Sequence, residues 1–280
     1  METEAPKSMR ERMDTDGYLV VPNVLSREEI VRLGKQIESH LTESWIECDC
    51  GKVQPHAAVA SPSIAWLFSH PGIVAALRGA MGTEDVVFTG DCNLHRNKLG
   101  NWHKDMGRVY GGYFRQDVFS AGDCRVLKVG LYLQDNDHPR TCFRVRRGSH
   151  REGSMDKGEL VTVPTRAGDA VLFDVRLTHS GMLPDPVEEV IWRVSRRLSS
   201  PNAEARLGRY AKEFWWRLAR KKDRLAIFFT YGARNAHTDE FTRNVRGALQ
   251  LMRLPDAQKR LDAKLVDSLR QSGIGIASDA

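Results

Sequence analysis

The 280-residue chain lacks the features that mark membrane and secreted proteins. No apolar run approaches the roughly 20 residues that a membrane helix needs. The start, Met1-Glu-Thr-Glu-Ala-Pro6, has neither the basic residues nor the apolar core of a signal peptide. The five cysteines are odd in number and scattered, which is typical of a reducing compartment without disulfides. We therefore expect a cytoplasmic protein without a membrane partner.

The composition is that of a folded globular protein. Hydrophobic residues make up 41% of the chain and charged residues 28%, which permits a substantial core and excludes general disorder. No internal repeat, low-complexity tract or linker marks a boundary, so we predict one domain over residues 1–280. The sequence leaves open whether the protein is a monomer or a homodimer.

The net charge of +6 has a local origin, because residues 206–224 hold eight Lys or Arg against two acidic residues. Nucleic acid is the obvious partner of a basic cluster. The cluster alternates with an apolar stripe, however, and no nucleic-acid motif accompanies it, which favours a solvated helix face and no nucleic-acid partner. We expect this helix to pack on the domain through its apolar stripe and to keep its basic side in water. The stripe consists of Leu207, Tyr210, Ala211, Phe214 and Leu218.

The pattern of elements predicts a mainly β fold with flanking helices. Ser26 and Glu29 form a capping box at the start of an amphipathic helix. A second helix is expected over residues 63–81, a helical insertion over 184–222 and a helical tail from about 240, whereas 44–62 looks irregular. Short strands separated by Gly and Asp turns favour an antiparallel sandwich or barrel. The expected strands cover residues 16–22, 86–90, 126–133, 141–146, 160–163, 170–175 and 224–232.

The segment Asn101-Trp-His-Lys-Asp105 carries the strongest chemical signal. In extended chain, residues i and i+2 point to the same face, so His103 and Asp105 can meet at one point. His179 follows 76 residues later at the end of another predicted strand. Two histidines and one carboxylate suit non-haem Fe(II), because three coordination positions stay open. The Gly-rich residues 106–122 after the first ligands are a candidate lid.

Together these segments resemble the phytanoyl-CoA dioxygenase (PhyH-type) family of Fe(II)/2-oxoglutarate-dependent oxygenases. The resemblance covers roughly residues 14–235. It rests on the opening segment 16–29, His103-Lys-Asp105, Leu131-Tyr-Leu-Gln-Asp135, Arg147-Gly-Ser-His150 and the distal segment 174–180. It implies a double-stranded β-helix, a cupin-like jelly roll, in which His103, Asp105 and His179 bind iron. It also implies that 2-oxoglutarate and O₂ are cosubstrates.

The family requires an arginine after the distal histidine to bind the far carboxylate of 2-oxoglutarate, since its planar fork matches a carboxylate. Arg224 opens a predicted strand and is preferred over Arg193, which has the more usual spacing from His179. Further candidate contacts are Lys128, Gln134 and Thr178, for each of which an ordinary structural role is also open. The family often has a hydroxyl two residues after the distal histidine. This chain has Gly181 there, and Ser180 or Thr178 could replace it.

These observations predict an oxygenase that hydroxylates a small molecule, with release of succinate and CO₂, in a biosynthetic pathway. Related halogenases have Ala or Gly in place of Asp105, so the carboxylate favours hydroxylation, or desaturation or cyclisation, over halogenation. Two other functions remain open: a non-catalytic jelly-roll binding protein, and a basic protein that binds or modifies nucleic acid.

Overall fold

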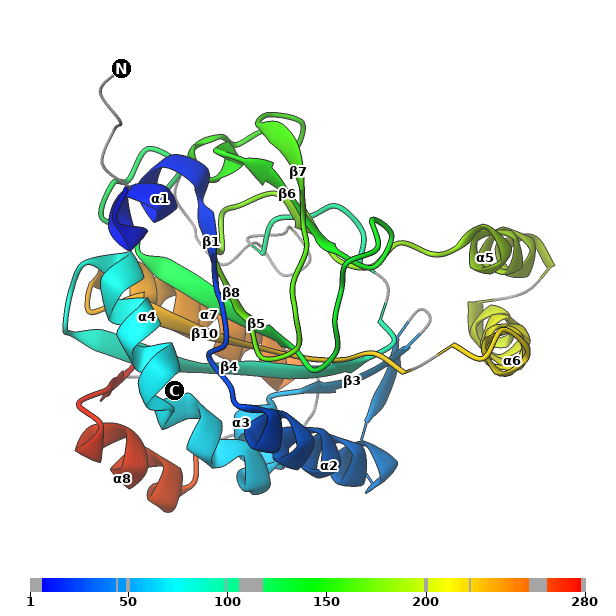
Figure 1. Cartoon of the computed structure of the whole chain (residues 1–280), viewed down its shortest axis with the longest axis horizontal. Coiled ribbons are helices and arrows are strands. Elements are labelled where there is room, and N and C mark those ends of the chain that lie inside the picture. The colour runs from blue at the N-terminus through cyan, green and yellow to red at the C-terminus, as the bar shows by residue number, and fades with distance from the viewer. Residues whose placement is uncertain are drawn as a thin grey trace.

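Two facing β-sheets and a layer of helices make up the fold (Figure 1). The computed structural model describes residues 7–43, 45–48, 51–98, 100–105, 118–198, 201–221, 223–251 and 261–277. The strands are β1 (Tyr18–Val21), β2 (Ile46–Cys48), β3 (Gly51–Pro55), β4 (Val86–Arg96), β5 (Val126–Tyr132), β6 (Phe143–Arg147), β7 (Glu159–Val163), β8 (Ala170–Asp174), β9 (His179–Ser180), β10 (Leu225–Ala233) and β11 (Gly275–Ile276). The helices are α1 (Met9–Asp16), α2 (Arg27–Glu43), α3 (Ala57–Ala60), η1 (Pro62–Ser69), α4 (Pro71–Met81), η3 (Ser149–Arg151), α5 (Pro186–Leu198), α6 (Pro201–Leu218), α7 (Ala236–Leu251) and α8 (Ala263–Gln271).

The strands wind back and forth between the two sheets. The major sheet has the order β1-β8-β5-β10-β4-β3-β2, with β11 added parallel to β4, and the minor sheet has the order β7-β6-β9. From β5 onward the chain passes from the major sheet to β6 and β7, returns to β8, crosses again to β9 and returns to β10. This winding of antiparallel strands is the jelly roll, or double-stranded β-helix, and the predicted fold class is confirmed.

Side chains alternate between the two faces of each strand, so the major sheet packs against a separate apolar core on each face. On β5, Leu127 and Val129 face the helices, and with residues of α1, α2, η1, α4 and α8 they form the larger apolar cluster. Tyr132 faces the other way and packs with Phe143 and Val145 of the minor sheet. The inner face of the major sheet therefore looks onto the minor sheet, and the functional site lies between them.

The capping box is confirmed, because the N–H of Ser26 donates to Glu29 and the N–H of Glu29 donates to the Ser26 hydroxyl. Other expectations fail. Residues 44–62 are not irregular, since they contain β2, β3 and α3. The single helix expected over 63–81 is two helices, η1 and α4, with Pro71 at the start of the second. Proline is accepted at that position because the first N–H groups of a helix have no partner within it.

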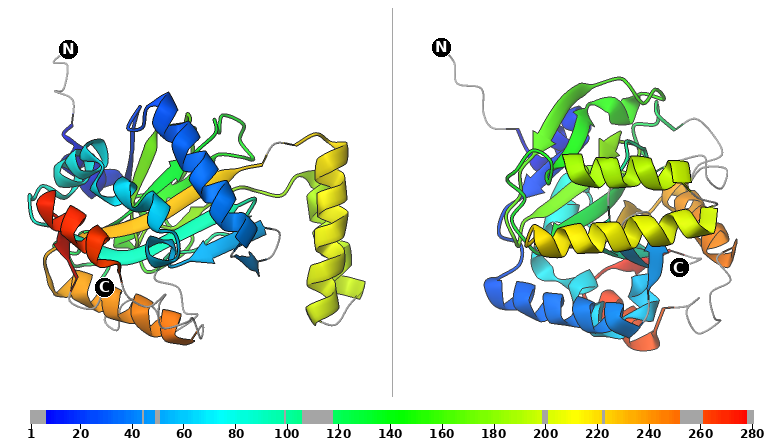
Figure 2. Two further views of the ribbon diagram at one scale, coloured as in Figure 1. Left: turned by 90° about the horizontal axis from the view of Figure 1, so that it is seen from below. Right: turned by 90° about the vertical axis from the view of Figure 1, so that its right-hand side faces the viewer.

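Helices α5 and α6 form a hairpin that projects from the side of the jelly roll (Figure 2). The expected packing of its apolar stripe on the domain is wrong. Tyr210, Phe214 and Leu218 are exposed, whereas Lys212 and Trp216 on the opposite face of α6 are buried. The side chain of Leu207 and most of the candidate lid, residues 106–117, lie outside the described part of the structure. Among the described residues, no helix combines the length and apolar character needed to cross a bilayer.

Candidate metal centre

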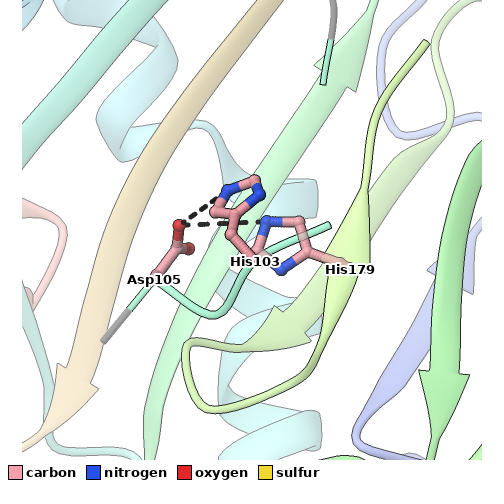
Figure 3. Close-up of side chains that lie close together, drawn as sticks. All are labelled: His103, Asp105 and His179. Carbon is pink, nitrogen blue, oxygen red and sulfur yellow. Dashed lines mark ion pairs between the residues drawn. The ribbon is translucent and has the colours of Figure 1, made fainter. Parts of the chain in front are cut away.

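Three side chains converge between the sheets: His103, Asp105 and His179 (Figure 3). One ligand atom of each lies within 4.8 Å of the other two. Asp105 Oδ1 is 3.7 Å from His103 Nε2 and 3.8 Å from His179 Nε2. The His179 side chain is buried, whereas that of His103 is 49% exposed. The cluster is therefore fixed in protein on one side and accessible on the other.

Backbone pairing holds the three residues in place. His103 and His179 exchange two hydrogen bonds, N–H to carbonyl in each direction, at 3.0 and 2.9 Å. The Asp105 N–H donates to the Val175 carbonyl at 3.1 Å. Residues 103–105 thus lie alongside 175–179, where the isolated bridge of His103 with His179 and the turn at 175–177 bring the His103 and Asp105 side chains together with His179.

Both imidazole rings turn the same nitrogen toward the centre. His103 Nδ1 lies 2.7 Å from the Asn101 carbonyl, and His179 Nδ1 lies 3.0 Å from the Leu177 carbonyl. Because a carbonyl only accepts, each Nδ1 donates and each neutral ring keeps the lone pair of Nε2 for the centre. Metal-binding histidines need this tautomer, and the hydrogen bond from the other nitrogen fixes the ring orientation.

Lys128 on β5 holds the second oxygen of the carboxylate. Its Nζ lies 3.0 Å from Asp105 Oδ2 and 3.5 Å from Asp91 Oδ2. Burial by itself would raise the pKa of Asp105, but Lys128, His179 and His103 together hold that pKa well below its ordinary value. Burial, reinforced by the charge of His103, lowers the pKa of His179 to about 3. Near neutral pH, Asp105 is ionised and His179 is neutral, which is the protonation state that a metal requires.

An irregularity in β4 brings Asp91 to this network. Residues 89–91 lie opposite Thr230 alone, and Gly90 has a φ of 78°, a conformation that favours glycine. The Thr230 hydroxyl donates to Asp91 Oδ2 at 2.8 Å. Thr230, Asp91 and Lys128 therefore form a chain of polar contacts that ends at a candidate metal ligand.

Lys104 lies between the two ligands in sequence and ties their segment to two others. Its buried Nζ donates to the carbonyls of Ser149 at 2.7 Å and Arg176 at 2.8 Å. The Ser149 hydroxyl in turn accepts from the Thr178 N–H at 2.9 Å. Burial lowers the pKa of Lys104 to about 8. The Gly-Ser-His turn thus supports both the His-X-Asp segment and the residue before His179.

The same turn packs against the Asp16-Gly17 start of β1. Gly17 has a φ of 80°, and a Cβ at this position would lie 2.4 Å from His150 Nδ1, so only glycine fits. His150 Nε2 donates to the Asp14 carbonyl at 3.2 Å. Two segments of the sequence resemblance, which lie more than 100 residues apart, are therefore one structural support for the centre.

A buried ion pair lies behind the centre. Arg176 donates to Asp174 through Nε at 2.9 Å and through Nη2 at 2.7 Å, and it also donates to three backbone carbonyls of residues 118–124. It therefore clamps this loop against the segment that leads to His179. Neither Asp174 nor Arg176 was assigned a role from the sequence. The signal that could have identified them is an acid and a base two residues apart, shortly before the distal histidine.

Arg224 lies directly before β10. Its Nη2 donates to Asn136 Oδ1 and to the Thr141 carbonyl, both at 2.5 Å, and its backbone N–H donates to Asn97 Oδ1 at 2.8 Å. Burial lowers the pKa of Arg224. Within the described ranges, no carboxylate lies within ion-pair distance of this guanidinium. Arg224 is thus a partly buried cation whose described hydrogen-bond partners are neutral.

Arg193, the other candidate anchor, lies on helix α5 and forms an ion pair with Glu189 at 3.0 Å. Its side chain is 63% exposed. Arg193 as the anchor would require a strand over residues 190–195, but Pro186–Leu198 is helical and the strand after His179 in the major sheet is β10.

The remaining sequence candidates occupy different surroundings. Gln134 Oε1 accepts from the Leu225 N–H at 2.9 Å and so helps to align the start of β10. Thr178 is buried, and its hydroxyl has no hydrogen-bond partner among the described residues. Ser180 donates to the Gly100 carbonyl at 2.7 Å. No described contact directs Gln134 or Ser180 toward the three ligands.

Trp102, next to the first ligand, packs beneath two arginines of β6. The guanidinium of Arg144 lies 4.9 Å from the ring centre, and that of Arg146 lies 5.6 Å from it. Arg144 also donates to the Ser180 hydroxyl at 2.9 Å. These contacts give Trp102 a packing role between the first ligand segment and β6.

Two aromatic residues near the centre were missed by sequence reasoning. His95 of β4 and Phe228 of β10 lie with their ring centres 5.0 Å apart. Burial lowers the pKa of His95 well below its ordinary value, and the charges of Lys98 and Lys128 act in the same direction. Alternation along the long strands β4 and β10 would have assigned both residues to the inner face.

A jelly roll with two imidazoles and one carboxylate between its sheets defines a class of mononuclear metal oxygenases. The family model of phytanoyl-CoA dioxygenase (PhyH) matches residues 13–182, more than half of the chain. The protein belongs to the phytanoyl-CoA dioxygenase (PhyH) family and is an enzyme of the 2-oxoglutarate-dependent oxygenase class. The match includes the three candidate ligands but ends before Arg224.

Solved structures show the same fold. The non-haem α-ketoglutarate-dependent epimerase SnoN of nogalamycin biosynthesis is 19% identical, with a TM-score of 0.55 over 80% of this chain and 81% of its own. The carbocyclase SnoK of the same biosynthesis is 17% identical, with a TM-score of 0.53 over 82% and 87%. HygX from Streptomyces hygroscopicus, with nickel, 2-oxoglutarate and hygromycin B bound, is 19% identical, with a TM-score of 0.54 over 79% and 85%. No curated protein matches the chain.

Proposed function

We propose that the protein is an Fe(II)- and 2-oxoglutarate-dependent oxygenase that hydroxylates a small molecule. The observation that carries this proposal is the convergence of His103 Nε2, His179 Nε2 and Asp105 Oδ1 with both Nδ1 atoms engaged elsewhere. Neighbouring ligand atoms of one octahedral ion with bonds of about 2.1 Å lie about 3 Å apart. The distances of 3.7 and 3.8 Å exceed this by less than 1 Å, so a small inward movement fits the residues to one iron.

The proposed anchor for the far carboxylate of 2-oxoglutarate is Arg224. A partly buried guanidinium whose described hydrogen-bond partners are neutral favours a further, negatively charged partner, and a carboxylate ligand would supply that charge. Its planar fork can bind that carboxylate through two parallel hydrogen bonds. Lys128 is retained as a candidate cosubstrate contact because it lies at the centre, in addition to its contact with Asp105.

Gln134 and Thr178 are weaker candidates for binding 2-oxoglutarate. The side-chain oxygen of Gln134 already accepts a backbone N–H. Thr178 offers a buried hydroxyl without a described partner, which leaves it able to donate to a ligand. The proposal therefore rests on Arg224, with Lys128 and Thr178 as secondary contacts.

When bound, iron and 2-oxoglutarate supply the activation of O₂, with release of succinate and CO₂. The protein's own residues hold the ligands, exclude water and aim one C–H bond of the substrate. His95 and Phe228 lie in contact on the inner face of the major sheet and are the proposed wall of the substrate pocket. The partly exposed ring of His103 marks the side from which a substrate approaches.

The substrate class that we propose is a natural product of a biosynthetic pathway. SnoN has been solved with Fe³⁺, α-ketoglutarate and nogalamycin RO, and HygX with hygromycin B. These relatives include an epimerase and a carbocyclase, so the shared fold is compatible with several outcomes. Hydroxylation is the preferred outcome for this chain, and desaturation or cyclisation is the alternative.

The proposal is tested by anaerobic loading of the purified protein with Fe(II) and 2-oxoglutarate, followed by exposure to ¹⁸O₂. We expect iron-dependent succinate formation and, with the correct substrate, a product that has gained one ¹⁸O atom. Absence of succinate with and without candidate substrates would favour a non-catalytic binding protein. Succinate with a product that has lost two hydrogens would replace hydroxylation by desaturation or ring closure.

A further inference from the structure

The hairpin of α5 and α6 stands apart from the rest of the fold. It is inserted between β9 and β10, and among the described residues its two helices pack chiefly against each other. The side views show both helices lying next to each other at one end of the molecule, joined to the jelly roll by two connecting segments (Figure 2). The outward face of this hairpin is therefore not covered by the jelly roll.

A buried polar cluster fixes the base of the hairpin. Asp185 accepts from Trp215 Nε1 at 3.0 Å and pairs with Lys221. Glu188, which is buried, accepts from Trp216 Nε1 and lies 3.5 Å from Lys221. Both acids also cap the start of α5 by accepting each other's backbone N–H. These contacts set the direction in which the outward face points.

That outward face is apolar. Of the nine large hydrophobic side chains that are exposed in the described chain, six lie on this hairpin. On α6 they are Tyr210, Phe214 and Leu218, with exposed fractions of 61%, 69% and 66%, at a spacing of four residues. On α5 they are Val187, Val190 and Val194. Such spacing places each set on one face of its helix. Exposed apolar rows of this kind are typical of an interaction surface.

We propose that this face binds a second copy of the same chain, with α6 packed antiparallel on α6 of the second copy about a two-fold axis near Phe214. The Tyr210–Phe214–Leu218 row is symmetric about its centre, so an antiparallel copy places Tyr210 beside Leu218 of the second copy and Phe214 beside its equivalent. An interface of this type is self-complementary, because residue i meets residue j and j meets i.

The charges beside the α6 row fit this arrangement. Glu213 and Arg217 are exposed and lie on the same side of the row, four residues apart. The two-fold axis is perpendicular to both helices. Rotation about it leaves Glu213 and Arg217 of both copies on the same side of the interface, while the two helices run in opposite directions. With the axis at Phe214, the positions of Glu213 in one copy and Arg217 in the other are offset by two residues, about 3 Å along the helices, a distance that the long arginine side chain can span. On α5 the corresponding charges, Glu189 and Arg193, already pair with each other, which favours α6 as the centre of the interface.

The size of the face is adequate. An 18-residue helix is about 27 Å long, and two adjacent helices are about 20 Å wide. The projected face is thus on the order of 500 Å², and side-chain relief increases the accessible area beyond that. A standard interface buries roughly 800 Å² per partner. Two hairpins that pack face to face therefore reach the range of a stable dimer.

An anionic membrane surface is the main competing occupant. Residues 186–222 hold ten Lys or Arg against four acidic residues, so this segment carries the whole +6 excess of the chain, and basic amphipathic helices bind anionic lipids. Among the described residues beside the apolar rows, however, each of two exposed acids lies four residues before a base: Glu189 before Arg193, with which it pairs, and Glu213 before Arg217. The two acids would face the anionic headgroups, whereas they match a second copy.

The test is the mass of the full chain in solution, measured by light scattering after size exclusion. We expect twice the mass of one chain for the unmodified protein, and the mass of one chain for Phe214→Glu. Leu160→Glu is the matched control, because Leu160 is exposed to 58% on β7, away from the hairpin; it should stay dimeric. Circular dichroism identifies any variant that has failed to fold.

Charge reversal tests the antiparallel geometry. Glu213→Arg alone and Arg217→Glu alone should each be monomeric, since each places like charges together at both contacts. An equimolar mixture of the two should form a heterodimer, because each altered residue then meets its opposite charge. A monomeric unmodified protein, a dimeric Phe214→Glu variant or a mixture that stays monomeric would each overturn the proposal. Co-sedimentation of a monomeric unmodified protein with vesicles of phosphatidylglycerol and phosphatidylcholine would assign the face to an anionic bilayer.

Discussion

Lys128 Nζ lies 3.0 Å from Asp105 Oδ2, while Oδ1 of the same carboxylate faces His103 and His179. The lysine therefore leaves one oxygen for a metal and fixes the orientation of the group. Its charge also contributes to the low pKa of Asp105. We predict that Lys128→Met weakens Fe(II) binding by about 10–100-fold, the usual effect of removing a group that orients a ligand. Anaerobic metal titration measures this.

The control for Lys128→Met is Lys264→Met, since Lys264 is exposed on α8. It should bind iron like the unmodified protein. Equal affinity of the Lys128 variant and this control would show that the ion pair does not position the carboxylate.

The two histidines should be required for the visible charge-transfer band of the Fe(II)–2-oxoglutarate chelate under anaerobic conditions. His103→Ala and His179→Ala each remove one of three protein ligands, and we expect both to abolish the band and iron-dependent succinate formation. His138→Ala, at an exposed position, should retain them. Retention of both signals in the two ligand variants would contradict the assignment of the centre.

Arg224→Ala should weaken 2-oxoglutarate binding. A hydrogen bond to a charged group contributes about 1.5–3 kcal/mol, which corresponds to a factor of roughly 10–150 in the dissociation constant. Arg193→Ala is the matched control, because Arg193 is exposed on α5 and pairs with Glu189. Both variants are titrated with 2-oxoglutarate in the presence of Fe(II). The opposite ranking would exclude Arg224 as the anchor.

Acid should destabilise the metal-free fold through His179. Its pKa falls from 6.5 to about 3 on folding, so the unfolded chain binds more protons between these values. Stability is therefore lost as the pH falls through this window, and the depressed pKa of Asp105 acts in the same direction below 3.8. We expect the unfolding temperature of the metal-free protein to fall as the pH is lowered below about 6.5. This fall in unfolding temperature should be smaller in His179→Gln than in the control His138→Gln. Parallel pH profiles for the two variants would refute this linkage.

Halide should not enter the product. Asp105 provides the carboxylate at the position where related halogenases leave room for chloride, and Lys128 holds it in place. We predict a product with oxygen from O₂, or with two hydrogens fewer, even in excess chloride or bromide. Asp105→Gly should lose most activity rather than gain halogenation, because the surrounding groups are not arranged for chloride. Mass spectrometry of the product decides, and a halogenated product from the unmodified enzyme would refute this role of Asp105.

Local sequence signals predicted much of the fold. The capping box of Ser26 and Glu29 marks the start of α2, and short apolar runs bounded by Gly and Asp turns identified β5 and β8. Such features depend only on residues a few positions apart, so they can be recognised from the order of residues in the sequence. The strands β2, β3 and β11 were missed. β2 and β11 have only three and two residues, too few for a pattern, and β3 begins with Gly51 and ends with Pro55, residue types that are depleted in strands.

The apolar stripe of α6 shows the opposite case. Helical spacing correctly placed Tyr210, Phe214 and Leu218 on one face, but the sequence does not contain what that face contacts. The prediction that it packs on the jelly roll failed, because Trp216 and Lys212 on the other face make the buried contacts at the base of the hairpin. Burial depends on the direction of the whole helix, which the polar cluster around Asp185 and Glu188 decides.

The sequence by itself determined the family, the jelly roll and the identity of the three candidate ligands, because residue type and the His-X-Asp spacing fix which donors are available and which share a face. Only the tertiary structure decided how they are held. Lys128, Lys104, Ser149 and Arg176 come from separate parts of the chain, and folding alone brings their charges and carbonyls around the ligands. Ionisation and tautomer depend on distance and burial, which are properties of the fold and not of any local pattern.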